Sequence, residues 1–176
     1  VVNNAGVLLP SMVTDLDAAD LERMLRVNLF GALFVMQEAV PIMRAQGVGS
    51  ILNVGSVLGL IPVPFGAYYS ASKHAIEGYS ESLDHEVRMF GIRVAVIEPW
   101  ATKTSIKANS PQGDRPVAAY AKTLAKYRAA FDKAMAAGDT PEDVAATIVA
   151  AAQDRVPRLR YPSGKAARQT SFARRF

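Results

Sequence analysis

The sequence contains no cysteine and only two histidines, His74 and His85, among its 176 residues. The absence of cysteine excludes a disulfide framework and a thiolate metal site. A zinc site built on the two histidines would need carboxylate partners, and none is suggestively spaced, so we expect no bound metal. Long hydrophobic runs are also lacking, because the longest, such as LFGALFVM, are too short to span a bilayer. No signal peptide is visible, and we therefore expect a cytoplasmic protein with no membrane span.

Acidic residues are missing from the end of the chain. Residues 155–176 carry a net charge of +7, whereas the 13 basic and 16 acidic side chains before them leave a net −3. A basic segment can bind nucleic acid or anionic lipid. Here the charges alternate with proline, leucine and tyrosine, and few aromatic rings are free to stack on bases. We expect a solvated tail or a subunit contact, and no nucleic-acid partner.

Strand-like and helix-like patterns alternate along the chain, and about half of the residues are apolar. The pattern predicts strands at the first residues, at 50–55, at 91–99 and at 157–164. It predicts helices over 17–46 with a break near Asn28, over 67–90 and 117–137, and from Pro141 onward with Thr140 as its cap. Asp15 or Asp17 can cap the first helix. This order is typical of a single α/β domain, residues 1–176, with a doubly wound parallel sheet.

Polar residues follow each predicted strand, at the edge of a parallel sheet where ligands bind. Two more, Tyr69 and Lys73, stand four residues apart and therefore share one face of the helix behind the second strand. Taken alone, such a pair is more often a simple helix-face contact. The residues after the strands are Asn3, Asn4, Ala5 and Gly6 after the first, Ser56 after the second, and Pro99, Trp100 and Thr104 after the third.

Five ordered motifs together resemble the short-chain dehydrogenase/reductase (SDR) family. They are NNAG, the asparagine of RVNLFG, NVGS, YSASK and EPWATKT. Ser56 lies thirteen residues before Tyr69, as the family pattern requires, whereas Tyr68 would break both that distance and the step to Lys73. The resemblance implies an NAD(P)-dependent oxidoreductase with a Rossmann-like fold that interconverts an alcohol and a ketone or aldehyde.

The resemblance also implies four catalytic residues. Tyr69 would give its phenolic proton to the substrate carbonyl or take the alcohol proton, and Ser56 would hydrogen-bond the reacting oxygen. A Lys73 ammonium would lower the pKa of the tyrosine and bind the nicotinamide ribose. Asn28 would hold a water that links Lys73 to solvent, although an asparagine there could simply mark a kink.

For the cofactor, which is NADP or NAD, the resemblance implies further contacts. Asn4, Ala5 and Gly6 would line its cleft, and Ile97, Pro99 and Thr104 would lie near the nicotinamide. Thr104 could instead cap a short helix. Trp100, where the family usually has glycine, would form a wall for the substrate. A lid over 105–140 would complete an apolar pocket, which hints at an apolar carbonyl or alcohol.

One family feature is missing, since no glycine-rich TGxxxGxG turn occurs anywhere in the sequence. We therefore expect this chain to correspond to the C-terminal part of the fold, from strand four onward, with the N-terminal nucleotide-binding half absent. Such a chain alone is expected neither to fold nor to bind dinucleotide. A homodimer or homotetramer through the helices 29–46 and 67–90 is implied. The alternative is a non-catalytic remnant or binding protein with the same fold.

Overall fold

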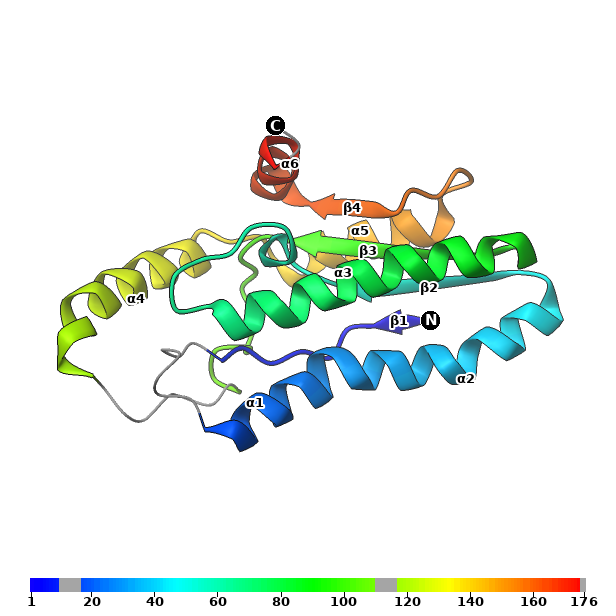
Figure 1. The fold of residues 1–176 in the computed structure, drawn as a ribbon. Helices are drawn as coiled ribbons and strands as arrows, with labels where there is room; N and C mark the ends of the chain where they lie inside the picture. The colour runs from blue at the N-terminus through cyan, green and yellow to red at the C-terminus, as the bar shows by residue number, and fades with distance from the viewer. Residues whose placement is uncertain (10–16, 110–116, 175–176) are drawn as a thin grey trace.

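The computed structural model describes residues 1–9, 17–109 and 117–174. Four parallel strands form one sheet in which neighbours follow the order of the chain (Figure 1). Residues Gly49 to Val54 of the second strand pair in register with Ile92 to Ile97 of the third. The strands are β1 (Val2–Asn3), β2 (Gly49–Val54), β3 (Ile92–Pro99) and β4 (Arg160–Ser163). The predicted parallel α/β sheet is therefore confirmed.

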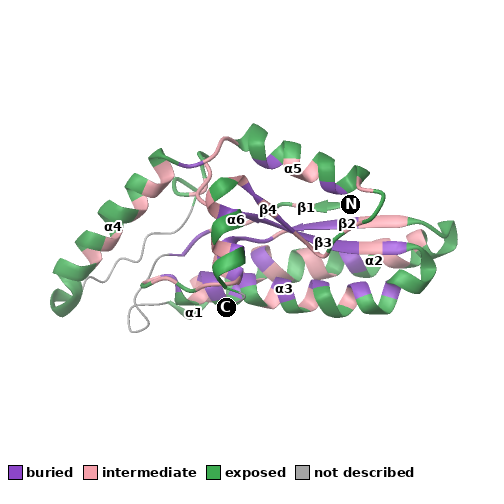
Figure 2. Cartoon of the chain, turned by 90° about the horizontal axis from the view of Figure 1, so that it is seen from above, coloured by how far each residue is buried: buried purple, intermediate pink, exposed green. Residues whose placement is uncertain are grey.

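Helices cover both faces of this sheet, as a parallel sheet with apolar residues on both sides requires (Figure 2). On one face, α2 (Gly31–Gln46) and α3 (Ala67–Val87) pack on Ile51, Ile92 and Val94. On the other face, α5 (Pro141–Gln153) packs on Leu52, Ala95 and Ile97. Because side chains alternate along a strand, β3 supplies both cores, and the Rossmann-like double winding follows.

The first long helix is interrupted where the sequence predicts a break. The helix α1 (Ala18–Leu25) runs through a π-helical segment, η2 (Arg26–Phe30), into α2. Asp17 caps it, accepting a hydrogen bond from the amide of Ala19 at 2.8 Å, and Gly47 ends it in the left-handed conformation (φ 69°). The other candidate cap, Asp15, lies outside the described residues.

Two of the remaining helices follow the sequence prediction closely. The helix α3 continues as a 3-10 turn, η4 (Arg88–Phe90), so that 67–90 is helical throughout. A capping box of Thr140 and Asp143 starts α5, with Pro141 in its first turn. Within 117–137, a 3-10 turn, η5 (Ala118–Tyr120), precedes α4 (Ala121–Ala136).

The basic end of the chain, expected as a solvated tail or a subunit contact, contains a helix that the sequence did not predict, α6 (Gly164–Ala173). Its buried face consists of Ala167 and Ser171, and Arg174 donates a hydrogen bond from Nε to the carbonyl of Leu60 at 2.9 Å. One small apolar residue and one serine give no readable helical pattern, so tertiary packing decides this element.

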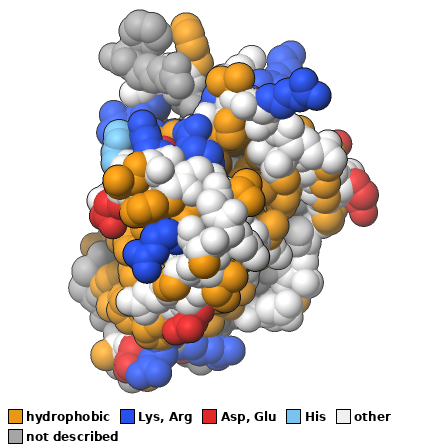
Figure 3. Space-filling model, turned by 90° about the vertical axis from the view of Figure 1, so that its right-hand side faces the viewer, with side chains coloured by type: hydrophobic (Ala, Val, Ile, Leu, Met, Phe, Trp, Pro, Cys, Tyr) orange, Lys and Arg blue, Asp and Glu red, His pale blue; other side chains and the backbone are white. Residues whose placement is uncertain are grey.

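On the face at the amino ends of the strands, basic side chains are scattered among hydrophobic and uncharged groups (Figure 3).

One helical stretch among the described residues, Ala18–Gln46, is long and apolar enough to cross a membrane by length and composition alone. The sequence prediction of no membrane span overlooked it, because the stretch contains polar residues that break its apolar runs. In the structure Met24 and Met36 of this stretch are buried against the rest of the fold. Core helices pass the same test of length and composition, so the finding is weak evidence for a span.

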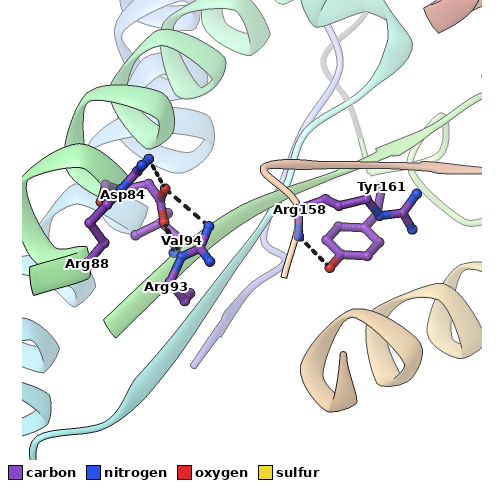
Figure 4. A network of polar contacts seen from close by, with 6 residues as sticks. All are labelled: Asp84, Arg88, Arg93, Val94, Arg158 and Tyr161. Atoms are coloured by element: carbon purple, nitrogen blue, oxygen red, sulfur yellow. Dashed lines mark hydrogen bonds and ion pairs between the residues drawn. The ribbon is translucent and has the colours of Figure 1, made fainter. Parts of the chain in front are cut away.

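A buried carboxylate ties α3 to the start of β3 (Figure 4). The Oδ1 atom of Asp84 accepts hydrogen bonds from the amide of Val94 at 2.9 Å and from Nε of Arg93 at 3.0 Å. Its Oδ2 atom accepts from Nη2 of Arg88 at 2.6 Å. Only 1% of Asp84 is exposed, so these partners replace the water that the carboxylate has lost.

We expect Asp84→Ala to lower the free energy of unfolding by about 3–5 kcal/mol, since it leaves the Val94 amide and two guanidinium groups without their buried partner. Urea unfolding followed by circular dichroism measures the change. Glu86→Gln, at an exposed position of the same helix, is the matched control and should alter stability by less than about 0.5 kcal/mol. Equal losses in both variants would contradict the assignment.

Candidate active site

A cavity of about 1000 Å³ opens at the carboxyl ends of β1, β2 and β3, beneath α4. This is the edge of a parallel sheet where ligands bind. The sequence-predicted residues that line the cavity are Asn4, Ala5, Gly6, Ser56, Tyr69, Lys73, Pro99, Trp100 and Thr104. The turns after three strands and the start of α3 thus come together around one space.

Tyr69 and Lys73 point from the first turns of α3 into this space, and both are buried. The Lys73 ammonium donates a hydrogen bond to the carbonyl of Val54, the last residue of β2, at 2.9 Å. Its Nζ atom lies 5.7 Å from the centre of the Tyr69 ring. Ser56 hydrogen-bonds the Tyr69 hydroxyl, and its Oγ also accepts from the amide of Leu58 at 3.1 Å. A phenol, a hydroxyl and an ammonium therefore converge.

Asn28 lies behind this group, in the π-helical segment, and does not line the cavity. Its Oδ1 atom accepts from the amide of Val7 at 2.8 Å, and its Nδ2 atom donates to the carbonyl of Val7 at 2.9 Å. Nδ2 also donates to Oγ of Ser72 at 3.2 Å, and Ser72 donates to the carbonyl of Tyr69. Asn28 thus ties the loop after β1 to α3, as π-helical insertions often do near functional sites.

Burial controls the proton affinities of the two central residues. Loss of water raises the pKa of Tyr69 to about 12, and the hydrogen bond from Ser56 only partly offsets this. Burial also lowers the pKa of Lys73 to about 8, against the opposing charge of Glu77. The pKa of Tyr69 therefore lies above its ordinary value, not below it as expected, because burial is the larger effect. The ammonium faces the ring and the Val54 carbonyl, and desolvation of the phenolate is the larger effect.

Ile97 does not line the cavity, although the sequence places it near the nicotinamide. Its side chain is fully buried in the core between the sheet and α5. Strand alternation turns Ile97 toward α5, and its carbonyl accepts from the amide of Gly55 at 2.8 Å. Any contact of Ile97 with a ligand would have to come through its backbone.

The lid expected over 105–140 includes α4, but sequence reasoning missed the part of the wall that α5 provides. Met135 lies in α4, and Val144, Ala145 and Ile148 lie in α5, and all four line the cavity. Their spacing on a helix is also that of ordinary core residues, so the sequence alone offered no signal to separate the two roles. Tyr127 and Phe131, expected in the lid, do line the cavity.

The residues at the cavity floor fit the nicotinamide ribose half of a dinucleotide. A Cβ on Gly6 would lie 3.7 Å from both the Lys73 ammonium and the Asn28 amide oxygen, which is ordinary van der Waals contact, so Gly6 lies next to both groups. The buried Lys73 ammonium has three N–H groups, and only the one on the Val54 carbonyl has an assigned partner among the described residues. The remaining donors can bind hydroxyl groups of a ligand.

Comparison with known proteins gives one consistent result. The family model of the short chain dehydrogenases matches residues 1–115. An uncharacterized oxidoreductase of Bacillus subtilis, YusZ, is 35% identical over 98% of this chain and 64% of its own length. The chain thus spans a little under two thirds of the length of that relative.

Solved structures match as well. A short-chain dehydrogenase from Streptomyces avermitilis has a TM-score of 0.85 and 29% identity over 98% of this chain and 62% of its own. An SDR protein from Burkholderia phymatum in complex with NAD has a TM-score of 0.76 and 27% identity, over 90% and 59%. A gluconate 5-dehydrogenase from Burkholderia cenocepacia with NADP and tartrate has a TM-score of 0.59 and 28% identity, over 71% and 48%.

The depressed pKa of Lys73 has a measurable consequence for stability. Between pH 8 and 10.5 the unfolded chain holds the lysine proton that the folded chain has released, so this residue makes stability rise with pH. We expect the free energy of unfolding of the wild type, relative to Lys73→Met, to increase by about 2 kcal/mol from pH 8 to pH 10. Urea unfolding at both pH values tests this. Lys126→Met, at an exposed position, should track the wild type at both.

Proposed function

The chain belongs to the short-chain dehydrogenase family, and from this premise we propose that it interconverts an alcohol and a ketone or aldehyde with NAD or NADP. The observation that carries the proposal is the convergence of Ser56, Tyr69 and Lys73 at one cavity. The gluconate 5-dehydrogenase and the Burkholderia phymatum protein hold NADP and NAD, which supports a nicotinamide cofactor without choosing between the two. An SDR enzyme of this kind fits a cytoplasmic location, which stays a prediction.

In reduction, Tyr69 is the proton donor to the carbonyl oxygen of the substrate. Its pKa of about 12 keeps the phenol protonated at neutral pH, so the proton to be donated is present. Ser56, already hydrogen-bonded to the same phenol, can donate to the oxygen as negative charge develops there. When bound, the reduced nicotinamide supplies the hydride.

Lys73 provides positive charge and hydrogen-bond donors at the cavity floor. The ammonium holds its proton more firmly than burial alone would allow, because the charge of Glu77 raises the pKa of Lys73 against the effect of desolvation. A charged Lys73 favours the phenolate that forms once Tyr69 has given up its proton. Asn28 holds α3 in place through Val7 and Ser72, and we infer that its role here is to position the helix that carries Tyr69 and Lys73.

The walls of the cavity favour an apolar substrate. Trp100, Ile106 and Phe131 face the space above Ser56 and Tyr69, together with Leu58 and Met135. Such side chains exclude water from the carbonyl and give no partner to a strongly polar substrate. The lid over 105–140 supplies several of them, and its residues 110–116 lie outside the described part of the chain.

A homodimer or homotetramer through α2 and α3 is part of the same proposal. Phe34 and Ile42 of α2 expose 62% and 61% of their surface, and Phe30 and Val35 lie on the same helical stretch. An exposed apolar helix face of this kind is usual at a subunit interface. The interface would also explain why the stretch Ala18–Gln46 is so apolar.

The alternative is a protein of this fold that binds a ligand without catalysis, because the glycine-rich phosphate turn is absent from the sequence. Titration of the intact protein with NADPH and NADH separately decides between the two. Trp100, the only tryptophan, lines the cavity. We expect its fluorescence to be quenched by at least one cofactor at micromolar concentration. A folded protein that responds to neither would support the non-catalytic alternative.

Tyr69→Phe removes the proton donor and leaves the ring in place. We expect it to lower kcat for carbonyl reduction by about 10²- to 10⁴-fold while cofactor affinity changes less than about threefold. Steady-state assays with apolar ketones and aldehydes, together with the fluorescence titration, measure both. Tyr68→Phe, next to it on α3, is the matched control and should retain activity. Comparable losses in the two variants would argue against Tyr69 as the donor.

A further inference from the structure

One buried acid near the proposed active site enters the mechanism above only through its charge. Glu77 follows Lys73 by four residues on α3, so the two side chains share a helix face. Only 5% of Glu77 is exposed. Its Oε2 atom accepts from Nε of Arg160 in β4 at 3.0 Å, which joins residues 83 apart in the sequence. The same arginine bonds Glu81 at 2.9 Å and lies 3.5 Å from Glu98 of β3.

The Glu77 side chain also packs directly beneath the turn that carries Ser56. A side chain on Gly55 would lie 3.1 Å from Oε1 of Glu77, and one on Gly59 would lie 3.1 Å from its Cγ and 2.9 Å from the carbonyl of Lys73. Because Gly55 and Gly59, on either side of Ser56, have no side chain, the turn can pack against Glu77. Within the described residues no hydrogen-bond partner reaches Oε1, which faces this turn.

We propose that Glu77, anchored by Arg160, is a positioning residue that supports the Ser56 turn and holds the proton on Lys73. The inference deepens the proposed function and rests on it for its catalytic meaning. Its side chain packs under the turn, and its position one helical turn after Lys73 puts the two side chains on one helix face.

The charges around the pair determine the direction of the effect. Lys73 is faced by Tyr69 and Glu77 on α3 and by the Val54 carbonyl of β2. Glu77 is faced by Arg160 of β4, Glu98 of β3 and Glu81 of α3. Burial, and then Glu98, raise the pKa of Glu77 to about 7, although Arg160 lowers it. Glu77 therefore gains or loses its charge near neutral pH, and only the charged form favours the Lys73 ammonium.

The test follows the Lys73 proton itself. In the intact protein labelled with ¹³C-lysine, the Cε signal of Lys73 is assigned by its loss in Lys73→Met and titrated from pH 6 to pH 10. We expect Glu77→Gln to weaken proton binding by Lys73 about tenfold. Glu81→Gln, which removes a neighbouring bond to the same arginine, is the matched control and should change it less than about twofold. Unchanged titration in Glu77→Gln would overturn the proposal.

The wild type offers a second measurement that needs no Glu77 variant. Its Lys73 signal should show an additional small inflection near pH 7, where Glu77 changes charge, and a single smooth titration would overturn the coupling. In activity assays, the alkaline limb of the kcat/KM profile should move to lower pH in Glu77→Gln and stay in place in Glu81→Gln. A shifted Lys73 titration in a protein without dehydrogenase activity would support the coupling and overturn the proposed function instead.

Discussion

The hydrogen bond between the buried Lys73 ammonium and the Val54 carbonyl joins the start of α3 to the end of β2. The contact places a cation where a parallel sheet already directs its loops. Desolvation of this cation is costly, which is seen in its depressed pKa, and nearby groups must offset the cost. Tyr69 and the loop containing Gly6 lie next to this buried charge, and Ser56 hydrogen-bonds Tyr69.

The helix α3 serves as the main support of the site because buried polar groups secure it along its length. Near its carboxyl end Asp84 binds the backbone and the arginine of β3. In its amino-terminal half Lys73 contacts β2, and at its middle Glu77 contacts β4. Apolar packing holds the same helix on the sheet but is not directional. The polar contacts select one position along the sheet, and a catalytic group needs that precision.

The cavity combines a polar floor and an apolar roof that come from different parts of the chain. The floor is built from the turns after β1, β2 and β3, whereas the roof belongs to α4 and the segment before it. An aromatic series of Phe65, Tyr127 and Phe131, with ring centres 5.4 and 6.1 Å apart, links the loop before α3 to this roof. On the proposed function, the reacting groups and the groups that would contact the substrate therefore lie on separate elements.

Local patterns in the sequence were sufficient for the helices before residue 154, for the parallel sheet and for the grouping of Ser56, Tyr69 and Lys73, because helical spacing and the strand ends depend on near neighbours. Only the tertiary structure decided that α6 forms and that Ile97 faces α5. It also decided that burial raises the pKa of Tyr69 in spite of Lys73, and that Arg160 reaches Glu77. Each of these depends on burial or on contacts between distant segments. Burial from solvent and pairing across the sheet arise only when the chain is packed, so they cannot be read from the order of the residues.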